Sequence, residues 1–524
     1  MYPSGLSQIF ISIAVTVTGW LFVKLIARGP FDPLPIIGHL HKTVRGRQFF
    51  FEWVLDGTRY HKEKDWLLNV MGARVWLIIE PSSIKTISLK VSTETDGSFD
   101  KTETASKVMG DLAGKGTLLI KGPLWRAHRT AANHLFASPK TIAHIVDHVL
   151  PRNKHVLTSA LSHAADQNVV VDAQQVMTTW LNAGFGDLAF GASSGEIHAK
   201  FSRAWTAASR PVIRRFITPF WRMKERFQSY GLQIQKDIAT ARGACHDLVT
   251  RTRQAIKEEE IGIQPPRDDG SGMVIRTLLE SDYTFTEEEL EDASLGFMFA
   301  ASDTTSHGLA WALYAMLRYP SYLPRLQAEI DSLPLELSSN TELSSHLPLL
   351  EAFISESLRL HPPTAVILSE CTASQPVVMP GGAVIKPGDR IYMLPWIMAR
   401  CRSIWGEDAE VFRPERWMEG GKRKSAYEFP VFFAGPRNCP GQQLGRSEMI
   451  YTLTVVLREF EFEAAWPMDP KDELAKAEKD GGVKEGDSYI WQRAGKKCME
   501  YGITSGVLGG LPVKIKRRKS GKTA

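Results

Sequence analysis

The chain has 524 residues, of which 43% are hydrophobic and 23% charged, a composition that is typical of a globular protein and excludes a disordered one. Its formal net charge of +5 is small and dispersed, so the sequence gives no reason to expect nucleic acid as a partner. The five cysteines include no C-x-x-C pair, which argues against a zinc site or redox dithiol and favours a reducing compartment.

The N-terminus begins with an apolar stretch, Ile9 to Ile26, that is about the minimum length for crossing a bilayer. No basic residue precedes it, whereas Lys24 and Arg28 lie at its end, so the positive-inside rule places the rest of the chain in the cytosol. A cleaved signal peptide is the competing interpretation, but its basic start is missing. We predict a single-pass membrane anchor over residues 1–28 and a stiff, proline-rich hinge over 29–40.

The strongest helical pattern lies in the middle of the chain and runs from Glu287 to Arg318. Thr286 and Glu289 form a capping box at its start, and the pattern stops before Pro320. At the helical rise these residues span about 48 Å, roughly the diameter of a domain. The helix is apolar nearly all round, which predicts that it is buried.

Shorter elements follow this helix. The sequence predicts helices over Tyr322–Ile330, Leu349–Leu360 and Leu444–Phe460, strands around Val377–Met379 and Arg390–Leu394, and a hairpin within Gly502–Arg518. The predicted fold class is therefore mainly α with small β-sheets.

One cysteine, Cys439, stands in a loop rich in Gly and Pro just before the Leu444 helix. Exposed backbone N–H groups and a helix N-terminus both favour a thiolate at this position. Gly435 and Gly441 would let the backbone approach a flat ligand closely, and Arg437 could pair with a carboxylate on that ligand. An inert core cysteine is the ordinary alternative.

This loop, FFAGPRNCPG, resembles the haem-binding loop of the cytochrome P-450 superfamily, whose pattern F-x-x-G-x-R-x-C-x-G is matched by Phe432, Gly435, Arg437, Cys439 and Gly441. The resemblance implies the cytochrome P-450 fold, with a long central helix and a single haem-thiolate domain over residues 41–524. It also implies haem b held by the Cys439 thiolate, with dioxygen as co-substrate, because thiolate donation favours O–O cleavage.

Two further motifs of the family occur in the expected order. Glu356 and Arg359 match its E-x-x-R pair, and Arg416 in the segment PERW matches the third member of a structural triad. On the long helix, Asp303 and Thr304 match the acid and alcohol that relay protons to bound oxygen, although Ala301 stands where the family usually has Gly. By itself Thr304 would be expected to bond back to a helix carbonyl.

Trp125 and Arg129 match the W-x-x-x-R motif that, in the family, hydrogen-bonds a haem propionate. Many members carry another arginine after the H-P-P segment, but this chain has Ser369 and Glu370 there. The resemblance therefore implies that Trp125, Arg129 and Arg437 anchor the propionates.

The anchor and the resemblance together predict the endoplasmic reticulum membrane as the location, with the catalytic domain in the cytosol. Electrons would come from NADPH through a membrane-bound NADPH–cytochrome reductase, because the chain has no flavin domain of its own. A basic surface near Arg126 and Lys422–Lys424 is a candidate docking site, and the tail Lys514–Lys522 a candidate contact with membrane lipid. A solvated charge run and a frayed tail are the alternatives.

The substrate-lining positions implied by the resemblance are apolar or small and include no charged anchor, which predicts a hydrophobic substrate. They are Phe297, Ala300, Ala301, Ala365, Val366, Ile367 and Val507. Several stretches resemble the microsomal fatty-acid hydroxylase branch, which favours hydroxylation of a long-chain fatty acid. Some members of that branch attach haem through a Glu, but Ala300 stands at that position, so no ester link is expected.

Two alternatives to fatty-acid hydroxylation stay open. The first is oxidative tailoring of a terpenoid or another secondary metabolite, because P-450 enzymes with one fold act on very different substrates. The second is a haem enzyme or binding protein without monooxygenase activity, against which the Asp303–Thr304 pair argues.

Overall fold

The computed structural model describes residues 50–519 apart from 71, 91–96, 191–194, 219, 264–271, 334–338, 340–341, 421–422, 467–496, 498 and 500–503. The predicted anchor and hinge lie outside the described residues. Among the helices that are described, none combines the length and hydropathy needed to cross a bilayer.

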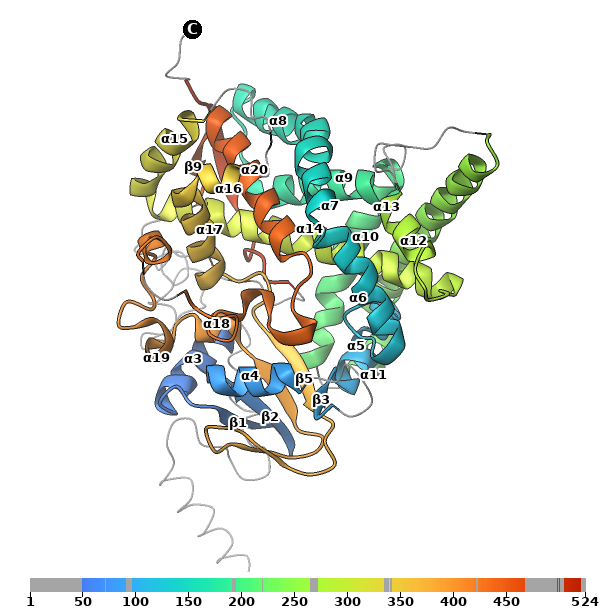
Figure 1. Cartoon of the computed structure of the whole chain (residues 1–524), viewed down its shortest axis with the longest axis vertical. Helices are drawn as coiled ribbons and strands as arrows, with labels where there is room; N and C mark the ends of the chain where they lie inside the picture. Colours follow the sequence, from blue (N-terminus) through green and yellow to red (C-terminus); the bar gives the residue numbers. More distant parts are fainter. Residues whose placement is uncertain are drawn as a thin grey trace, which may run out of the picture.

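Most of the described chain is helical (Figure 1). The helices are α3 (Phe50–Tyr60), α4 (Pro81–Leu89), α5 (Glu103–Ala113), α6 (Gly122–Phe136), α7 (Pro139–His144), α8 (Leu150–Asp166), α9 (Ala173–Phe190), α10 (Gly195–Arg214), α11 (Trp221–Phe227), α12 (Ser229–Glu260), α13 (Met273–Leu279), α14 (Glu287–Arg318), α15 (Leu323–Asp331), α16 (Leu343–His346), α17 (Pro348–Leu360), α18 (Pro395–Met398), α19 (Arg402–Trp405) and α20 (Gln442–Glu459).

The strands form three small sheets. They are β1 (Trp66–Val70), β2 (Ala73–Ile78), β3 (Phe99–Asp100), β4 (Val171–Asp172), β5 (Ile367–Cys371), β6 (Val377–Val378), β7 (Val384–Ile385), β8 (Arg390–Met393), β9 (Phe460–Ala464) and β10 (Pro512–Arg517). The largest sheet has the order β1-β2-β8-β5-β3, and its one parallel pair is β2 with β8. The fold class predicted from the sequence is confirmed.

The long predicted helix forms as α14, and both hydrogen bonds of the Thr286–Glu289 capping box are present. Most of its residues are buried, because α9, α12, α17 and α20 pack around it. Figure 1 shows α14 crossing the middle of the helical body, with the largest sheet at one end of the molecule. This position lets one helix contact elements from both halves of the chain, among them α9 and α20.

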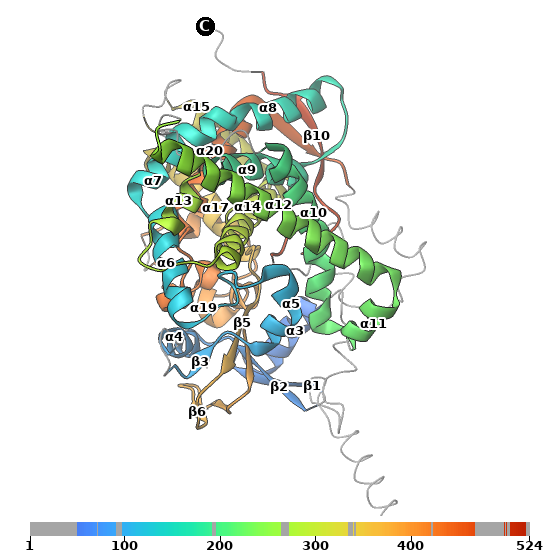
Figure 2. The same cartoon turned by 90° about the vertical axis from the view of Figure 1, so that its right-hand side faces the viewer.

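Two elements near the C-terminus differ from the prediction. Helix α20 ends at Glu459, and Phe460 opens β9 instead of closing the helix. In the segment of the predicted terminal hairpin, β10 pairs antiparallel with β9 and with β4, which the prediction did not include, while Val507 forms an isolated antiparallel bridge to Met499. Figure 2 shows β10 beside α8, at the end opposite the largest sheet. Because β10 is far in sequence from β4 and β9, a local sequence pattern could not predict that these strands pair.

Candidate functional site

The loop around Cys439 is held in an unusual backbone conformation. The Cys439 N–H donates to the carbonyl of Phe432 at 2.8 Å, and the cysteine stands three residues before the start of α20. Gly435 has a φ of +71°, and a Cβ built there would lie 2.6 Å from the Ser88 carbonyl oxygen of α4. Glycine is therefore required at this point, and the close contact with α4 fixes the loop.

The side chain of Cys439 is exposed, whereas those of Cys245, Cys371 and Cys401 are buried. Protein atoms nevertheless crowd the thiol, and desolvation raises its pKa, opposed by an N–H of Gly441 and by the guanidinium of Arg129. Binding to a metal ion would displace the proton from such a thiol.

Cations gather on one side of this loop. Arg437 lies over the Trp125 ring at 4.3 Å and approaches Asp100 to 3.4 Å, with its side chain 5% exposed. Arg129 donates to the side-chain oxygen of Asn438 at 2.6 Å and also to the Asn438 backbone carbonyl. The Arg129 guanidinium is thus tied to the loop itself, directly beside the cysteine.

Lys101 is a member of this cationic group that the sequence analysis missed. Desolvation, followed by repulsion from Arg437, lowers its pKa to about 8, while Asp100 opposes the change. Lys121 lies 3.9 Å from the same Asp100 carboxylate. Three cations therefore surround one carboxylate, which leaves an excess of positive charge available to an anionic ligand.

The acid and alcohol on α14 lie in different surroundings. The Thr304 hydroxyl donates to the carbonyl of Ala300 at 2.9 Å, which is the local bond expected of a helical threonine. The carboxylate of Asp303 accepts a hydrogen bond from the hydroxyl of Thr504, a residue of the C-terminal segment. Thr504 was not among the predicted site residues, because no local motif marks it.

A cavity of about 220 Å³ lies along α14, and Ala300 and Thr304 form part of its wall. Val366 and Ile367, which were predicted to line the substrate site, line this cavity too. Most other lining residues are apolar, from α5, α10, α14 and neighbouring loops, and include Met109, Leu119, Ile213, Phe216 and Phe299. Lys101 also lines this cavity, whereas the predicted lining residues included no charged side chain.

Four other predicted lining residues lie outside the walls of this cavity: Phe297, Ala301, Ala365 and Val507. Phe297 is 2% exposed and packs in the core against His128 and Phe136. Phe299, two residues further along α14, contacts the cavity in its place. Residues two apart on a helix point in nearly opposite directions, so Phe297 and Phe299 do not face this cavity together.

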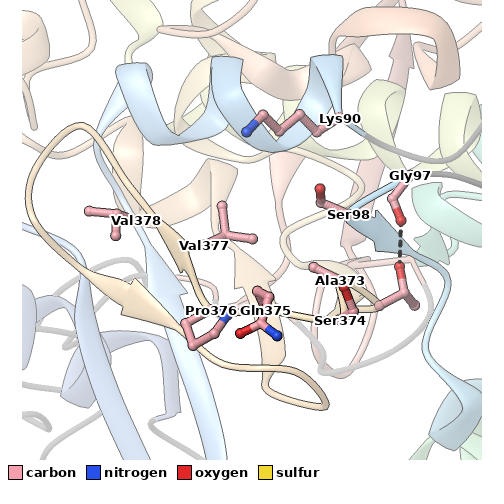
Figure 3. A pocket seen from close by; sticks show the side chains of 10 residues that line it. Lys90, Gly97, Ser98, Ala373, Ser374, Gln375, Pro376, Val377 and Val378 are labelled. Atoms are coloured by element: carbon pink, nitrogen blue, oxygen red, sulfur yellow. Dashed lines mark hydrogen bonds between the residues drawn. The ribbon is translucent and has the colours of Figure 1, made fainter.

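A second hollow lies at the surface between the end of α4 and the segment that leads into β6 (Figure 3). Lys90, Ser98 and residues 372–378 line it, and the Thr372 hydroxyl donates to the Gly97 carbonyl at 2.9 Å. None of its lining residues belongs to α6, α14 or the Cys439 loop. The chemistry predicted from the sequence is therefore not located in this hollow.

The predicted structural triad forms as expected. Glu356 and Arg359 are completely buried and share two hydrogen bonds of 2.8 Å, and Arg416 Nε donates to the same carboxylate at 3.0 Å. The sequence analysis missed the indole of Trp417, which donates to Glu356 at 2.9 Å. Arg359 also donates to backbone carbonyls of the segment 399–411, so the triad ties α17 to the chain that precedes the Cys439 loop.

A further carboxyl group, Glu448 on α20, is buried where α20 packs against α14. Desolvation raises its pKa from 4.5 to about 8, opposed by a hydrogen bond from Thr305. Folding therefore favours the protonated carboxyl. The free energy of unfolding that this preference adds at low pH is lost as the pH rises from about 4.5 to about 8.

We expect Glu448→Gln, whose side chain cannot ionise, to show a smaller fall in melting temperature than the wild type across this pH range. Thermal unfolding of both proteins at several pH values measures it, and parallel curves would contradict it.

The sequence model of the family described as Cytochrome P450 matches residues 28–488 of this chain. The chain belongs to the cytochrome P-450 family. P-450 enzymes are haem monooxygenases with a cysteine thiolate as axial ligand, so this chain is an oxidoreductase that uses haem, dioxygen and a redox partner.

Individual P-450 relatives are distant in sequence. Cytochrome P450 704C1 of Pinus taeda is 29% identical over 402 residues, which cover 70% of this chain and 76% of that protein. Cytochrome P450 94A1 of Vicia sativa is 26% identical, covering 81% and 83% of the two chains, and Alkane hydroxylase MAH1 of Arabidopsis thaliana is 25% identical, covering 81% and 86%. The crystal structure of the cytochrome P450DA heme domain has a TM-score of 0.71 at 18% identity, covering 93% of this chain and 96% of that one, and confirms the P-450 fold.

The residues around Cys439 fit a haem group. Haem needs one axial thiolate and partners for two propionate carboxylates, and this site offers an accessible thiol beside a cluster of cations. Arg437 and Lys101 supply more positive charge than Asp100 neutralises. The Trp125 ring packs against one face of the Arg437 guanidinium. The donor set therefore has the composition that a P-450 haem requires.

Proposed function

We propose that this P-450 binds haem through Cys439 and hydroxylates a long-chain fatty acid or a similar extended aliphatic substrate. The observation that carries the proposal is the cavity along α14, because its wall is mainly apolar and includes Thr304 of the predicted acid–alcohol pair. The relative named as an alkane hydroxylase supports an aliphatic substrate. An aliphatic chain would exclude water from such a cavity and leave its hydroxylated carbon near α14.

A spectral titration of the ferric holoenzyme tests the substrate class. Long-chain fatty acids and a panel of terpenoids are added in parallel, and the low-spin to high-spin change of the haem is followed. We expect a saturable change with fatty acids. A change with terpenoids alone would replace this proposal with oxidative tailoring of a secondary metabolite.

The proposed mechanism assigns proton handling to α14. Bound haem supplies oxygen activation, and the overall reaction converts substrate, dioxygen, NADPH and a proton into alcohol, water and NADP⁺. Thr304, on the cavity wall, donates its hydroxyl proton to the Ala300 carbonyl, so its oxygen would accept a hydrogen bond from a water in the cavity. Asp303 would supply protons to that water from its carboxyl. A substrate chain packed against the apolar side chains of the wall would displace water from this part of the cavity.

We expect Thr304→Ala to bind haem normally but to release more hydrogen peroxide for each NADPH consumed. Loss of one proton-relay group lowers product formation by about 10-fold or more, because general acid–base catalysis contributes at least about 10²-fold. Peroxide, product and NADPH are measured in one reaction, and Thr305→Ala, whose side chain does not line the cavity, is the neighbouring control. Unchanged coupling in Thr304→Ala would remove the proton role from Thr304.

Membrane attachment at the endoplasmic reticulum is part of the proposal, as is electron supply by an NADPH-dependent reductase. One surface of the described chain supports a membrane contact. Large apolar side chains in and beside α11 are exposed there, and their exposed fractions are 76% for Phe220, 57% for Met223, 77% for Phe227 and 74% for Leu232. Figure 2 shows α11 at the side of the molecule, and Arg222, Lys224 and Arg226 lie among these residues. Apolar and basic side chains on one short helix suit the surface of an anionic bilayer.

We expect the Phe220→Asp/Phe227→Asp double variant to bind anionic phospholipid vesicles several-fold more weakly once residues 1–28 have been removed. Vesicle sedimentation of the truncated protein with and without the two substitutions measures the difference. The double variant Val378→Asp/Val384→Asp, which changes exposed apolar residues on β6 and β7, is the control. Equal binding by all three truncated proteins would exclude α11 from the membrane contact.

A further inference from the structure

The C-terminal segment forms a terminal loop, Thr504–Val507, that lies directly on α14. The N–H of Ser505 donates to the Pro363 carbonyl at 2.6 Å, and the indole N–H of Trp311 on α14 donates to the Ser505 carbonyl at 2.8 Å. At the end of the loop, the Val507 N–H donates to the side-chain oxygen of Gln174 on α9 at 2.6 Å. Partners on three separate segments therefore fix the backbone of this loop.

The terminal loop covers one face of α14. Asp303 and His307 are four residues apart and share this face. A Cβ built on Gly506 would lie 2.7 Å from His307 Nε2 and 2.8 Å from the Gln174 side-chain oxygen. The loop therefore lies in close contact with side chains of α14 and α9 at this position.

Within this fixed loop, Thr504 connects two parts of the site. Its hydroxyl donates to Oδ2 of Asp303, and Thr504 is also one of the residues that line the cavity beside Thr304. Thr504 is 7% exposed, so bulk water does not compete strongly for this hydrogen bond. No hydrogen bond to the other carboxylate oxygen, Oδ1, is present among the described residues.

A hydroxyl that donates to one carboxylate oxygen fixes the orientation of the whole group. It also leaves Oδ1 of Asp303 as the oxygen that can exchange a proton with water or with the neighbouring alcohol. Such a bond is worth more in a partly desolvated site than at the surface. A carboxylate that rotates freely would present either oxygen in many directions and would pass protons less efficiently.

We propose that Thr504 is a positioning residue that orients the Asp303 carboxylate for proton delivery. This inference rests on the proposed relay role of Asp303 and Thr304, and it adds a residue from another segment of the cavity wall. Because Thr504 lines that cavity, the orientation of Asp303 depends on the loop that a substrate would contact. Thr504 itself transfers no proton to the substrate.

The first test measures coupling in holoenzymes that carry Thr504→Val, Thr504→Ser, Asp303→Asn or Thr304→Ala. Thr504→Val removes the hydroxyl at nearly constant volume, whereas Thr504→Ser keeps it. We expect Thr504→Val to raise the ratio of peroxide released to NADPH consumed several-fold, in the direction of Asp303→Asn, and Thr504→Ser to stay close to the wild type. Coupled turnover by Thr504→Val, or equal uncoupling by both Thr504 variants, would overturn the proposal.

The second test does not depend on activity. Melting temperatures are measured for Thr504→Val, Asp303→Ala and the double variant. If the hydroxyl and the carboxylate interact, the shift of the double variant is smaller than the sum of the two single shifts. Additive shifts would show that the two side chains do not interact and would also overturn the proposal.

The two tests separate this inference from the proposed function. If Asp303→Asn and Thr304→Ala turn over without extra peroxide, the relay role is wrong and the positioning role of Thr504 is wrong with it. If those two variants are uncoupled and Thr504→Val is not, the relay stands and only the positioning role is wrong.

Discussion

Cys439→Ser is expected to fold but to lose all monooxygenase activity and the carbon monoxide difference spectrum that is typical of a thiolate-ligated haem. Serine is nearly the same size, but its hydroxyl is a much weaker acid than a thiol and does not supply the electron density that favours O–O cleavage. Because the Cys439 side chain is exposed, the substitution should change the stability of the haem-free protein by about 0.5 kcal/mol or less.

The matched control is Cys245→Ser. The Cys245 thiol is buried, and it donates to the Glu291 carbonyl at 3.4 Å, away from the haem loop. Serine there should lower stability but keep the thiolate spectrum. A thiolate spectrum that persists in Cys439→Ser and disappears in Cys245→Ser would refute the ligand assignment.

Glu356→Ala is expected to have the largest effect on stability. The completely buried carboxylate of Glu356 accepts hydrogen bonds from the side chains of Arg359, Arg416 and Trp417 and from the backbone N–H of Arg413. Alanine would leave the Arg359 guanidinium buried without its carboxylate, and removing one partner of a buried ion pair costs about 3–5 kcal/mol. We expect little or no holoenzyme, because the segment before the haem loop loses its attachment to α17.

Urea denaturation and the yield of haem-loaded protein measure this effect. Glu407→Ala is the control, because Glu407 forms an ion pair with Arg402 at 2.9 Å in which both side chains are largely exposed. Exposed pairs contribute about 0–1 kcal/mol, so this variant should yield normal holoenzyme. Similar losses of stability and of holoenzyme in the two variants would mean that burial does not explain how much the triad contributes to the free energy of unfolding.

The features that the sequence predicted correctly are local. The capping box and the apolar surface of α14 lie within one segment. The Glu356–Arg359 pair is separated by one helical turn, so spacing alone brings the side chains together. Each of these features follows from residues that are neighbours in sequence.

The features that the sequence analysis missed depend on segments that are distant in sequence. Thr504 reaches Asp303 across about 200 residues, and Lys101 approaches Arg437 across more than 300. Burial in the folded core raises the pKa of Glu448, and the sequence around it does not show that burial. The position of Phe299 on the cavity wall, in place of Phe297, follows from the exact rotation of α14, which its nearly uniform apolar surface does not determine.

The pairing of β10 with β4 and β9 has a consequence for synthesis on the ribosome. Val171 and Asp172 emerge early, and α8 and α9 on either side of β4 can form while later residues are still being made. Pro512–Arg517 is translated after every strand that it pairs with. The three-stranded sheet therefore closes only after Arg517 has been made, and until then the edges of β4 and β9 remain open to other nascent chains or to chaperones.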